Sequence, residues 1–202
     1  MRSQKEKMIA GDLYIASDPE LAKDSHRGKR LARLLNNTTE EDGELRTKIL
    51  KQLFKKTGEN IYIEPPFHID YGSNTTIGEN FYANYDCIFL DIAPITIGKN
   101  VMMAPRVGLY TAAHPIVADI RNEQLEYGKP ITIGDNVWIG ANAIVNPGIT
   151  IGNNVVIGSG SVVTKNIPDN SVAVGNPCHV LREINDDDRK YWEHEKERYF
   201  EN

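Results

Sequence analysis

The sequence predicts an all-β solenoid, a parallel β-helix of triangular cross-section, from three observations. Apolar or small residues recur every six positions, and glycine repeatedly follows the repeat residue. The longest run is Ile133, Ile139, Val145, Ile151, Ile157 and Val163. An α-helix repeats about every 3.6 residues and a strand about every 2, so neither accounts for a period of six. Three sides of six residues make a coil of eighteen, which stacks about 4.8 Å from the next coil.

Two shorter runs with the same period precede the longest one. They are Tyr71, Ile77, Ala83 and Phe89, then, after a shift of two, Ile97, Met103 and Leu109. We predict that each repeat residue points into the core and that Gly or Asn at the corners adopts a positive φ. The repeat is interrupted over residues 110–130, and this segment is predicted to project as a loop. Long loops on a regular scaffold tend to carry function.

Helical periodicity precedes and follows the solenoid. Residues 1–60 are predicted as a helical N-terminal segment, residues 61–182 as the β-helix, and residues 183–202 as a C-terminal helix. The expected helix boundaries are Ser3 and Gly11, then Asp24 or Ser25, then Thr38 or Thr39, and Gly58. The last helix is expected to cover the open end of the solenoid, because solenoid ends expose unpaired strand edges.

Composition excludes several classes of function. The chain has 202 residues, of which 40% are hydrophobic, enough for one domain with a small helical extension. A net charge of −5 without a long basic run argues against a nucleic-acid partner. An apolar signal region and an 18-residue apolar run are both absent, so we expect a cytoplasmic protein without a membrane partner. We interpret Cys87 and Cys178 as small buried residues rather than a disulfide, and we predict no metal.

Longer motifs resemble one known family over nearly the whole chain. They are EKMIAGDLY, YIEPPFHIDYGSNTTIGENFYANYDC, YTAAHPI, KPITIGDNVWIGANAIVNPGITIG and VVTKNIPDNSVAVGNPC. They are similar to the maltose and galactoside O-acetyltransferases, within the hexapeptide-repeat acyltransferases. LDIAPITIG and EYGKPITIG look more like the maltose enzyme, whereas YGSN and REINDDDRKYW look more like the galactoside enzyme, so the acceptor stays open. The resemblance implies a left-handed β-helix, acetyl-CoA as donor, a sugar acceptor, and a homotrimer with sites between subunits.

The resemblance also implies a catalytic base, His114, in the motif Thr111–Pro115. A sugar hydroxyl must lose its proton as it attacks, and histidine is the usual base near neutral pH. The alternative is a loop histidine that only packs. The residues implied for the acceptor are Asn84, Asp70, Asp91 and Tyr127. Asn and Asp also favour tight turns, so corner stabilisation is the alternative for the first three.

The donor side of the family pattern maps to the later coils. It covers Trp138, Ala141, Ser159, Thr164, Lys165, His179 and Arg182. The resemblance implies that a backbone amide at Gly140–Ala141 meets the thioester and that the indole flanks the reacting region. Lys165 and Arg182 are expected to meet CoA phosphates as cations, while the alternative for Lys165 is a solvated surface side chain. His179 stands where the galactoside enzyme has an arginine, which weakens that contact.

Three other functions compete with sugar acetylation. The first is acetylation of another small acceptor such as serine or an antibiotic, although the EKMIAGDLY start favours sugars. The second is a zinc lyase of the carbonic anhydrase kind, which needs three converging histidines; besides His114, only His68 and His179 lie in or beside the solenoid. The third is a non-catalytic assembly module, against which His114, Asn84 and Trp138 together argue.

Overall fold

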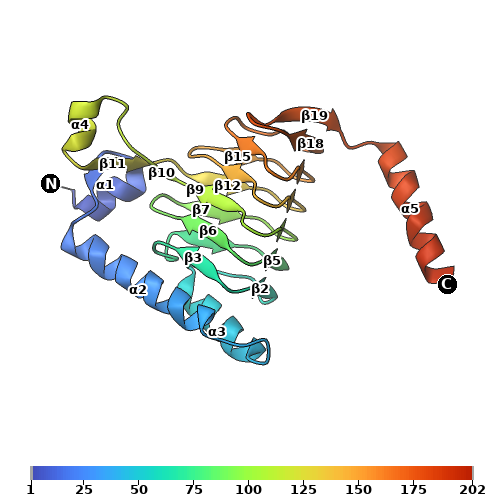
Figure 1. Ribbon diagram of the computed structural model, residues 1–202, viewed down its shortest axis with the longest axis horizontal. Coiled ribbons are helices and arrows are strands. Elements are labelled where there is room, and N and C mark those ends of the chain that lie inside the picture. The colour runs from blue at the N-terminus through green and yellow to red at the C-terminus, as the bar shows by residue number, and fades with distance from the viewer. Residues whose placement is uncertain (1, 202) are drawn as a thin grey trace.

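The six-residue period folds into a triangular prism of short stacked strands, which the computed structural model describes over residues 2–201 (Figure 1). The four-stranded side holds β4 (Thr75–Ile77), β7 (Ile95–Ile97), β12 (Ile131–Ile133) and β15 (Thr150–Ile151). The five-stranded side holds β3 (Phe67–Ile69), β6 (Cys87–Leu90), β9 (Gly108–Tyr110), β14 (Ile144–Val145) and β17 (Val162–Val163). The seven-stranded side holds β2 (Ile61–Ile63), β5 (Phe81–Ala83), β8 (Met102–Met103), β13 (Trp138–Ile139), β16 (Val156–Ile157), β18 (Ser171–Val174) and β19 (His179–Glu183). The predicted parallel β-helix is confirmed.

The residues of the predicted repeat fill the interior of this prism. Every member of the three runs is at most 6% exposed, which confirms the prediction that they point inward. Tyr71 is the one that packs elsewhere. It belongs to a separate apolar cluster with Met8, Tyr14, Leu21 and Ile92, which joins the N-terminal segment to the prism.

The predicted coil length of eighteen residues holds where Thr132 pairs with Thr150, whereas in the last coil Val156 pairs with Val172, sixteen residues on. In the earlier coils Phe67 pairs with Cys87, twenty residues on. The two extra residues lie at the corner where the chain passes from the five-stranded to the four-stranded side, around 70–72 and 91–93. The insertion of residues 111–130 leaves the prism at the same corner one coil later.

Asparagines line the corner between the four-stranded and seven-stranded sides. Asn80, Asn100, Asn136, Asn154 and Asn170 all have φ between 55° and 57°. Each side-chain amide donates to the asparagine of the next coil, from Asn60 through to Asn170, at 2.8–3.1 Å. Asparagine tolerates the left-handed region better than most residues, so the predicted positive φ at corners is confirmed here.

The N-terminal helices are α1 (Gln4–Ala10), α2 (Pro19–Asn36) and α3 (Gly43–Leu53). α1 begins at a capping box on Ser3 and ends at Gly11, as predicted. α2 begins earlier than predicted, because Asp18 accepts from the Glu20 N–H at 2.9 Å and proline follows it.

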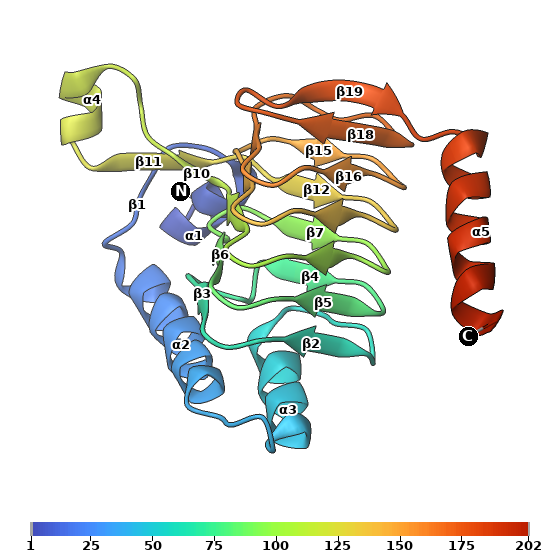
Figure 2. The same cartoon turned by 45° about the vertical axis from the view of Figure 1, so that its right-hand side comes forward.

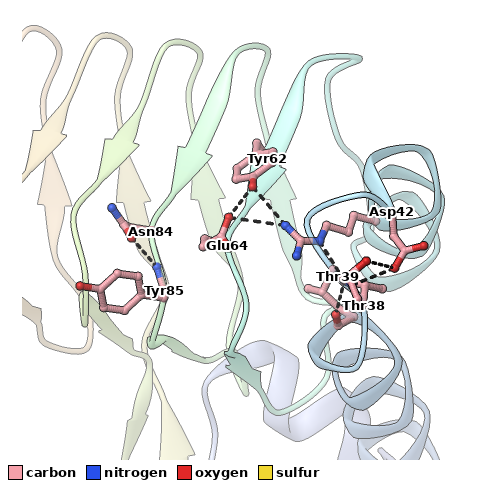
Figure 3. A network of polar contacts seen from close by, with 9 residues as sticks. Thr38, Thr39, Asp42, Tyr62, Glu64, Asn84 and Tyr85 are labelled. Carbon is pink, nitrogen blue, oxygen red and sulfur yellow. Dashed lines mark hydrogen bonds and ion pairs between the residues drawn. The ribbon is translucent and has the colours of Figure 1, made fainter.

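α3 ends before the predicted Gly58, because the Lys55 N–H joins the prism by donating to the Thr75 carbonyl at 3.0 Å. The buried Arg46 of α3 donates to the Thr38 hydroxyl (2.8 Å) and to the Tyr62 hydroxyl (3.1 Å). Figure 3 shows Tyr62 and Glu64 on the first coil, across from Thr38, which lies in the loop between α2 and α3. These contacts fix the helices to the start of the solenoid.

The insertion contains β10 (Ala112–Ala113), α4 (Ala118–Asn122) and β11 (Leu125–Gly128), and it projects from the prism in both views (Figures 1 and 2). β11 pairs antiparallel with β10 and with β1 (Tyr14–Ile15). This three-stranded sheet ties the insertion to the N-terminal segment.

The C-terminal helix α5 (Asp186–Glu201) stands beside the prism and does not cross its open end (Figure 2). The prediction that it covers that end is wrong. The last parallel strand is instead covered by β19, which pairs antiparallel with β18. From 186 to 201 the helix buries none of its residues.

Candidate active site

His114 lies at the start of the insertion, directly after β10, and its side chain is exposed. Thr111 fixes the chain before it: the buried hydroxyl donates to the Leu90 carbonyl (2.6 Å) and accepts from the Ala93 N–H (3.0 Å). Beyond it, the Arg121 guanidinium donates to the Pro115 carbonyl at 3.0 Å. The backbone is therefore held on both sides of an imidazole that faces solvent.

A pocket of about 240 Å³ lies between the N-terminal segment and the insertion. Asp70 and Glu126 both line it, and the Tyr14 hydroxyl donates to Glu126 at 3.0 Å. Burial raises the pKa of Asp70, while Lys29, whose Nζ lies 3.9 Å from Asp70 Oδ1, opposes the rise. Carboxylates, an amine and hydroxyls that converge in one pocket suit a ligand rich in hydroxyl groups.

Glu126 lines this pocket, whereas the family resemblance implied its neighbour Tyr127 as an acceptor contact. Successive strand residues point to opposite faces, so the two side chains point to opposite sides of the three-stranded sheet. Tyr127 lies across from Ala113, the residue before His114. The alternation of a strand would have pointed to Glu126, but no periodic pattern in residues 110–130 predicts a strand.

Asp91 is fully buried at the corner of the early coils that contains the two extra residues. Its Oδ1 accepts from the Tyr71 N–H at 2.8 Å, and its Oδ2 accepts from the Thr75 hydroxyl at 2.9 Å. Burial raises the pKa of Asp91 to about 6, against the lowering by these donors. With both oxygens occupied inside the protein, the geometry favours corner stabilisation over contact with an acceptor.

Asn84 lies at a different corner, between the seven-stranded and five-stranded sides. Its Oδ1 accepts from the Tyr85 N–H at 2.9 Å, and Figure 3 shows the amide nitrogen pointing away from Tyr85. Ala141 and Ser159 occupy the same corner in later coils. Trp138 lies on the adjoining seven-stranded side, where it is 50% exposed.

Two backbone donors at this corner have no acceptor within residues 2–201. They are the Ala141 N–H and the Ser159 N–H, whereas the Gly140 N–H donates to the Ile157 carbonyl at 2.7 Å. A Cβ on Gly140 would lie 2.6 Å from the Ser159 backbone nitrogen, so only glycine permits this close approach of coils.

Thr164, Lys165 and His179 line one cavity of about 340 Å³ near the last coil. Arg182 does not line it. The Asp188 carboxylate holds both terminal nitrogens of its guanidinium, at 2.6 and 2.8 Å, and raises its pKa. Contact between Arg182 and a CoA phosphate would require this pair to break, so the geometry does not favour the predicted role.

The sequence-predicted residues therefore fall into two groups within one chain. Asp70, His114 and Lys165 follow one corner, where the five-stranded side meets the four-stranded side. Asn84, Ala141 and Ser159 follow the corner between the seven-stranded and five-stranded sides. The width of the five-stranded side separates the two groups, so one chain does not bring them together.

In the part of the chain from 2 to 201, no three His, Cys, Asp or Glu side chains gather as metal ligands. No helix in the same range is long and apolar enough to cross a bilayer. Cys87 and Cys178 are free and buried, as predicted.

Comparisons with known proteins agree with this architecture. Residues 7–58 match the maltose acetyltransferase hexapeptide capping motif, and residues 130–165 match the bacterial transferase hexapeptide (six repeats). The chain is 46% identical to the galactoside O-acetyltransferase of Escherichia coli, over 93% of this chain and 92% of that protein.

Two solved structures share the fold at similar identity. A maltose O-acetyltransferase from Clostridium difficile is 57% identical with a TM-score of 0.90, covering 91% of this chain and 98% of that one. A galactoside acetyltransferase in complex with coenzyme A is 45% identical with a TM-score of 0.91, covering 94% of each chain. The chain is thus an acetyltransferase that belongs to the maltose and galactoside O-acetyltransferase family of hexapeptide-repeat proteins.

Proposed function

We propose that the protein transfers the acetyl group of acetyl-CoA directly to a hydroxyl of a sugar, with His114 as general base. The observation that carries this proposal is the position of His114 along one corner of the prism. Toward the first coils, this corner carries the polar pocket of Asp70 and Glu126. Toward the last coils, it carries the cavity of Lys165 and His179. A base between a hydroxyl-binding pocket and a cationic cavity matches an acceptor and a phosphate-bearing donor.

The reaction needs one proton transfer in each direction. The acceptor oxygen attacks the thioester carbonyl while an imidazole nitrogen of His114 takes its proton. The resulting tetrahedral oxyanion needs a donor, and the available Ala141 N–H is our candidate. When the carbon–sulfur bond breaks, the imidazolium returns the proton to the departing thiolate, which leaves CoA and the acetyl ester.

The acceptor contacts follow from the polar pocket. Carboxylates accept hydrogen bonds from sugar hydroxyls, so Asp70 and Glu126 would orient the ring, with Tyr127 beside the base. The amide of Asn84 supplies a further donor from the other corner. Maltose-type, glucose-type and galactoside acceptors all present the hydroxyl pattern that this pocket suits.

The donor contacts follow from the cavity of Lys165 and His179. Lys165 supplies a cation for a CoA phosphate, and Thr164 and His179 supply hydrogen-bonding groups in the same cavity. Trp138 offers a half-exposed indole next to the Ala141 corner, which suits the apolar part of the donor near the thioester.

We further propose that the active protein is a homotrimer with sites between subunits. The outward residues of the four-stranded side are threonines in register, such as Thr96 and Thr132. The other two sides carry outward apolar residues, such as Met102 next to Trp138 and Ile144 next to Val162. A closed ring uses two different patches of each subunit, whereas a twofold dimer uses one. Two apolar sides and one hydrophilic side therefore fit a ring, which would bring the two corner groups of neighbouring subunits together.

The proposal is tested by acetyl-CoA consumption across glucosides, galactosides, maltose, amino acids and chloramphenicol-like acceptors. We expect consumption with at least one sugar and its loss in His114→Ala, whereas the matched control His194→Ala on α5 keeps the parent rate. Consumption only with an amino acid or an antibiotic would replace the sugar by that acceptor. Lack of consumption with every acceptor would overturn the enzymatic proposal.

A further inference from the structure

Helix α5 carries an aromatic surface that no part of residues 2–201 covers. Tyr191, Trp192, Tyr199 and Phe200 are 57–77% exposed, and they form two edge-to-face pairs with ring centroids 5.1 Å apart. Isolated helices of this length are marginal in water, because most helix stability in proteins comes from packing of an apolar face. A helix with four exposed aromatic side chains therefore requires a partner surface.

The aromatic residues lie on one half of the helix, and the helix is acidic. Residues seven or eight apart share a face, which places Trp192, Tyr199 and Phe200 together. α5 has seven acidic and four basic side chains, a net charge of −3 with His194 neutral. The surface that covers it should therefore be apolar in the centre and basic at the edge.

Such a surface exists at the opposite end of the chain. A groove of about 400 Å³ runs between α2 and the strands β3 and β6. It is lined by apolar Ala32, Phe67 and Leu90, by Lys29, Arg33 and His68, and by Asp70, whose carboxylate lies 3.9 Å from Lys29 Nζ. α2 has five basic and two acidic side chains, a net charge of +3 with His26 neutral. Across residues 2–201 Arg33 makes no ion pair, so its charge is available to an acidic helix.

Along the solenoid axis, the C-terminal end of α5 lies at the same level as this groove. Its sixteen residues span about 24 Å, equal to about five coils of the prism. Both views show the helix descending beside the prism, so that its C-terminal end lies level with the first coils (Figures 1 and 2). The groove belongs to those same coils, since β3 and β6 form its floor. A rotation about an axis parallel to the solenoid leaves every position along that axis unchanged. In a ring of copies, the groove of one subunit therefore lies at the same level as the C-terminal end of α5 in its neighbour.

We propose that α5 of each subunit docks into the groove between α2 and β3 of the next subunit. This inference rests on the proposed homotrimer. The groove lies at the corner that carries Asp70, which lines both the groove and the polar pocket, and the proposed ring places that corner against a neighbouring subunit. α5 follows β19 at the corner between the four-stranded and seven-stranded sides, where the Ile184 N–H donates to the Asn170 carbonyl at 2.8 Å. Phe200 and Tyr199 would fill the groove, and the acidic helix would lie along the basic face of α2.

The first test is a cysteine cross-link. The double variant Phe200→Cys with Arg33→Cys, treated with a short bismaleimide, should give covalent dimers and trimers on a denaturing gel. The control pair Phe200→Cys with Thr132→Cys places the second thiol on the four-stranded side and should stay monomeric on the gel. Native Cys87 and Cys178 are buried, so they do not compete for the reagent.

The second test follows Trp192 itself in a Trp138→Phe background. Docking predicts blue-shifted emission and at least a several-fold weaker quenching by acrylamide than in the peptide 186–201. Arg33→Glu in the groove should restore quenching toward that of the peptide. Light scattering of each sample separates the outcomes. A trimer without the cross-link and with a quenchable Trp192 overturns the docking and leaves the assembly standing, whereas a monomer overturns both.

Discussion

Asp91→Asn should make the protein more stable at neutral pH, although it changes a fully buried and hydrogen-bonded residue. The carboxylate is charged at pH 7 in an environment that raises its pKa from 3.8 to about 6. Asparagine has nearly the same shape and carries no charge. Its oxygen can accept from the Tyr71 N–H, and its amide can donate to the Thr75 hydroxyl, which can turn to accept.

The size of the effect follows from linkage. A shift of about two pKa units corresponds to about 3 kcal/mol between the charged and neutral forms. Because the folded state binds this proton more tightly than the unfolded state, the contribution of Asp91 to stability is fully present below about pH 4. It is lost as the pH rises toward 6 and stays lost above that. Asp91→Asn should therefore gain up to about 3 kcal/mol at pH 8 and little at pH 4.

Urea unfolding followed by circular dichroism, with parent and variant at equal protein concentration, measures this difference at several pH values. Turnover with the best sugar acceptor, measured in parallel, separates a corner role from a contact with the acceptor. We expect an unchanged KM for the sugar, because both carboxylate oxygens face the protein. A variant that is less stable than the parent at pH 8 would refute the reasoning from burial, and a large rise in the sugar KM would restore Asp91 to the acceptor site.

Three further predictions follow from the site and the fold. His114→Ala should lower turnover about 10²–10⁴-fold while acetyl-CoA binding by calorimetry is unchanged, because the residue is an exposed loop base; turnover within a few-fold of the parent would exclude it. Lys165→Ala should raise the KM for acetyl-CoA more than Arg182→Ala does, since Asp188 already holds Arg182; the opposite order in steady-state kinetics would contradict this. Asn136→Ala should lower the free energy of unfolding in urea by about 1–2 kcal/mol, because it loses two side-chain hydrogen bonds and because alanine tolerates a φ of 57° less well than asparagine does. Asn136→Gly loses the same bonds without the strain and should lower it less, and equal losses would remove backbone strain as a cause.

The interior of the prism could be predicted from the sequence because its signal is local and repeated. Each of Ile133, Ile139 and Val145 has the same environment as the residue six positions away, so one pattern identifies them all. The corner asparagines follow for the same reason. Coil length was less predictable, since two additional residues at a corner leave the strands on both sides unchanged.

The sequence did not reveal features that depend on contacts between distant segments. Glu126 enters the polar pocket only because β11 pairs with β1, more than one hundred residues earlier. Asp91 matched a family motif for the acceptor, yet its carboxylate faces Tyr71 and Thr75 of the previous coil. Asp18 caps α2 in place of Asp24 or Ser25, although a cap followed by proline was a readable local signal.

The separation of the two corner groups has a consequence for how activity is controlled. His114 and Ala141 lie at opposite edges of the five-stranded side, whose strands are held by parallel ladders above and below. A stacked solenoid of this kind has no hinge between its coils, so motion within one chain does not close that distance. Under the proposed trimer, base and oxyanion donor meet only across a subunit contact. Activity then depends on assembly and not on folding alone, and dilution below the assembly threshold should abolish turnover while the circular dichroism of the prism is unchanged.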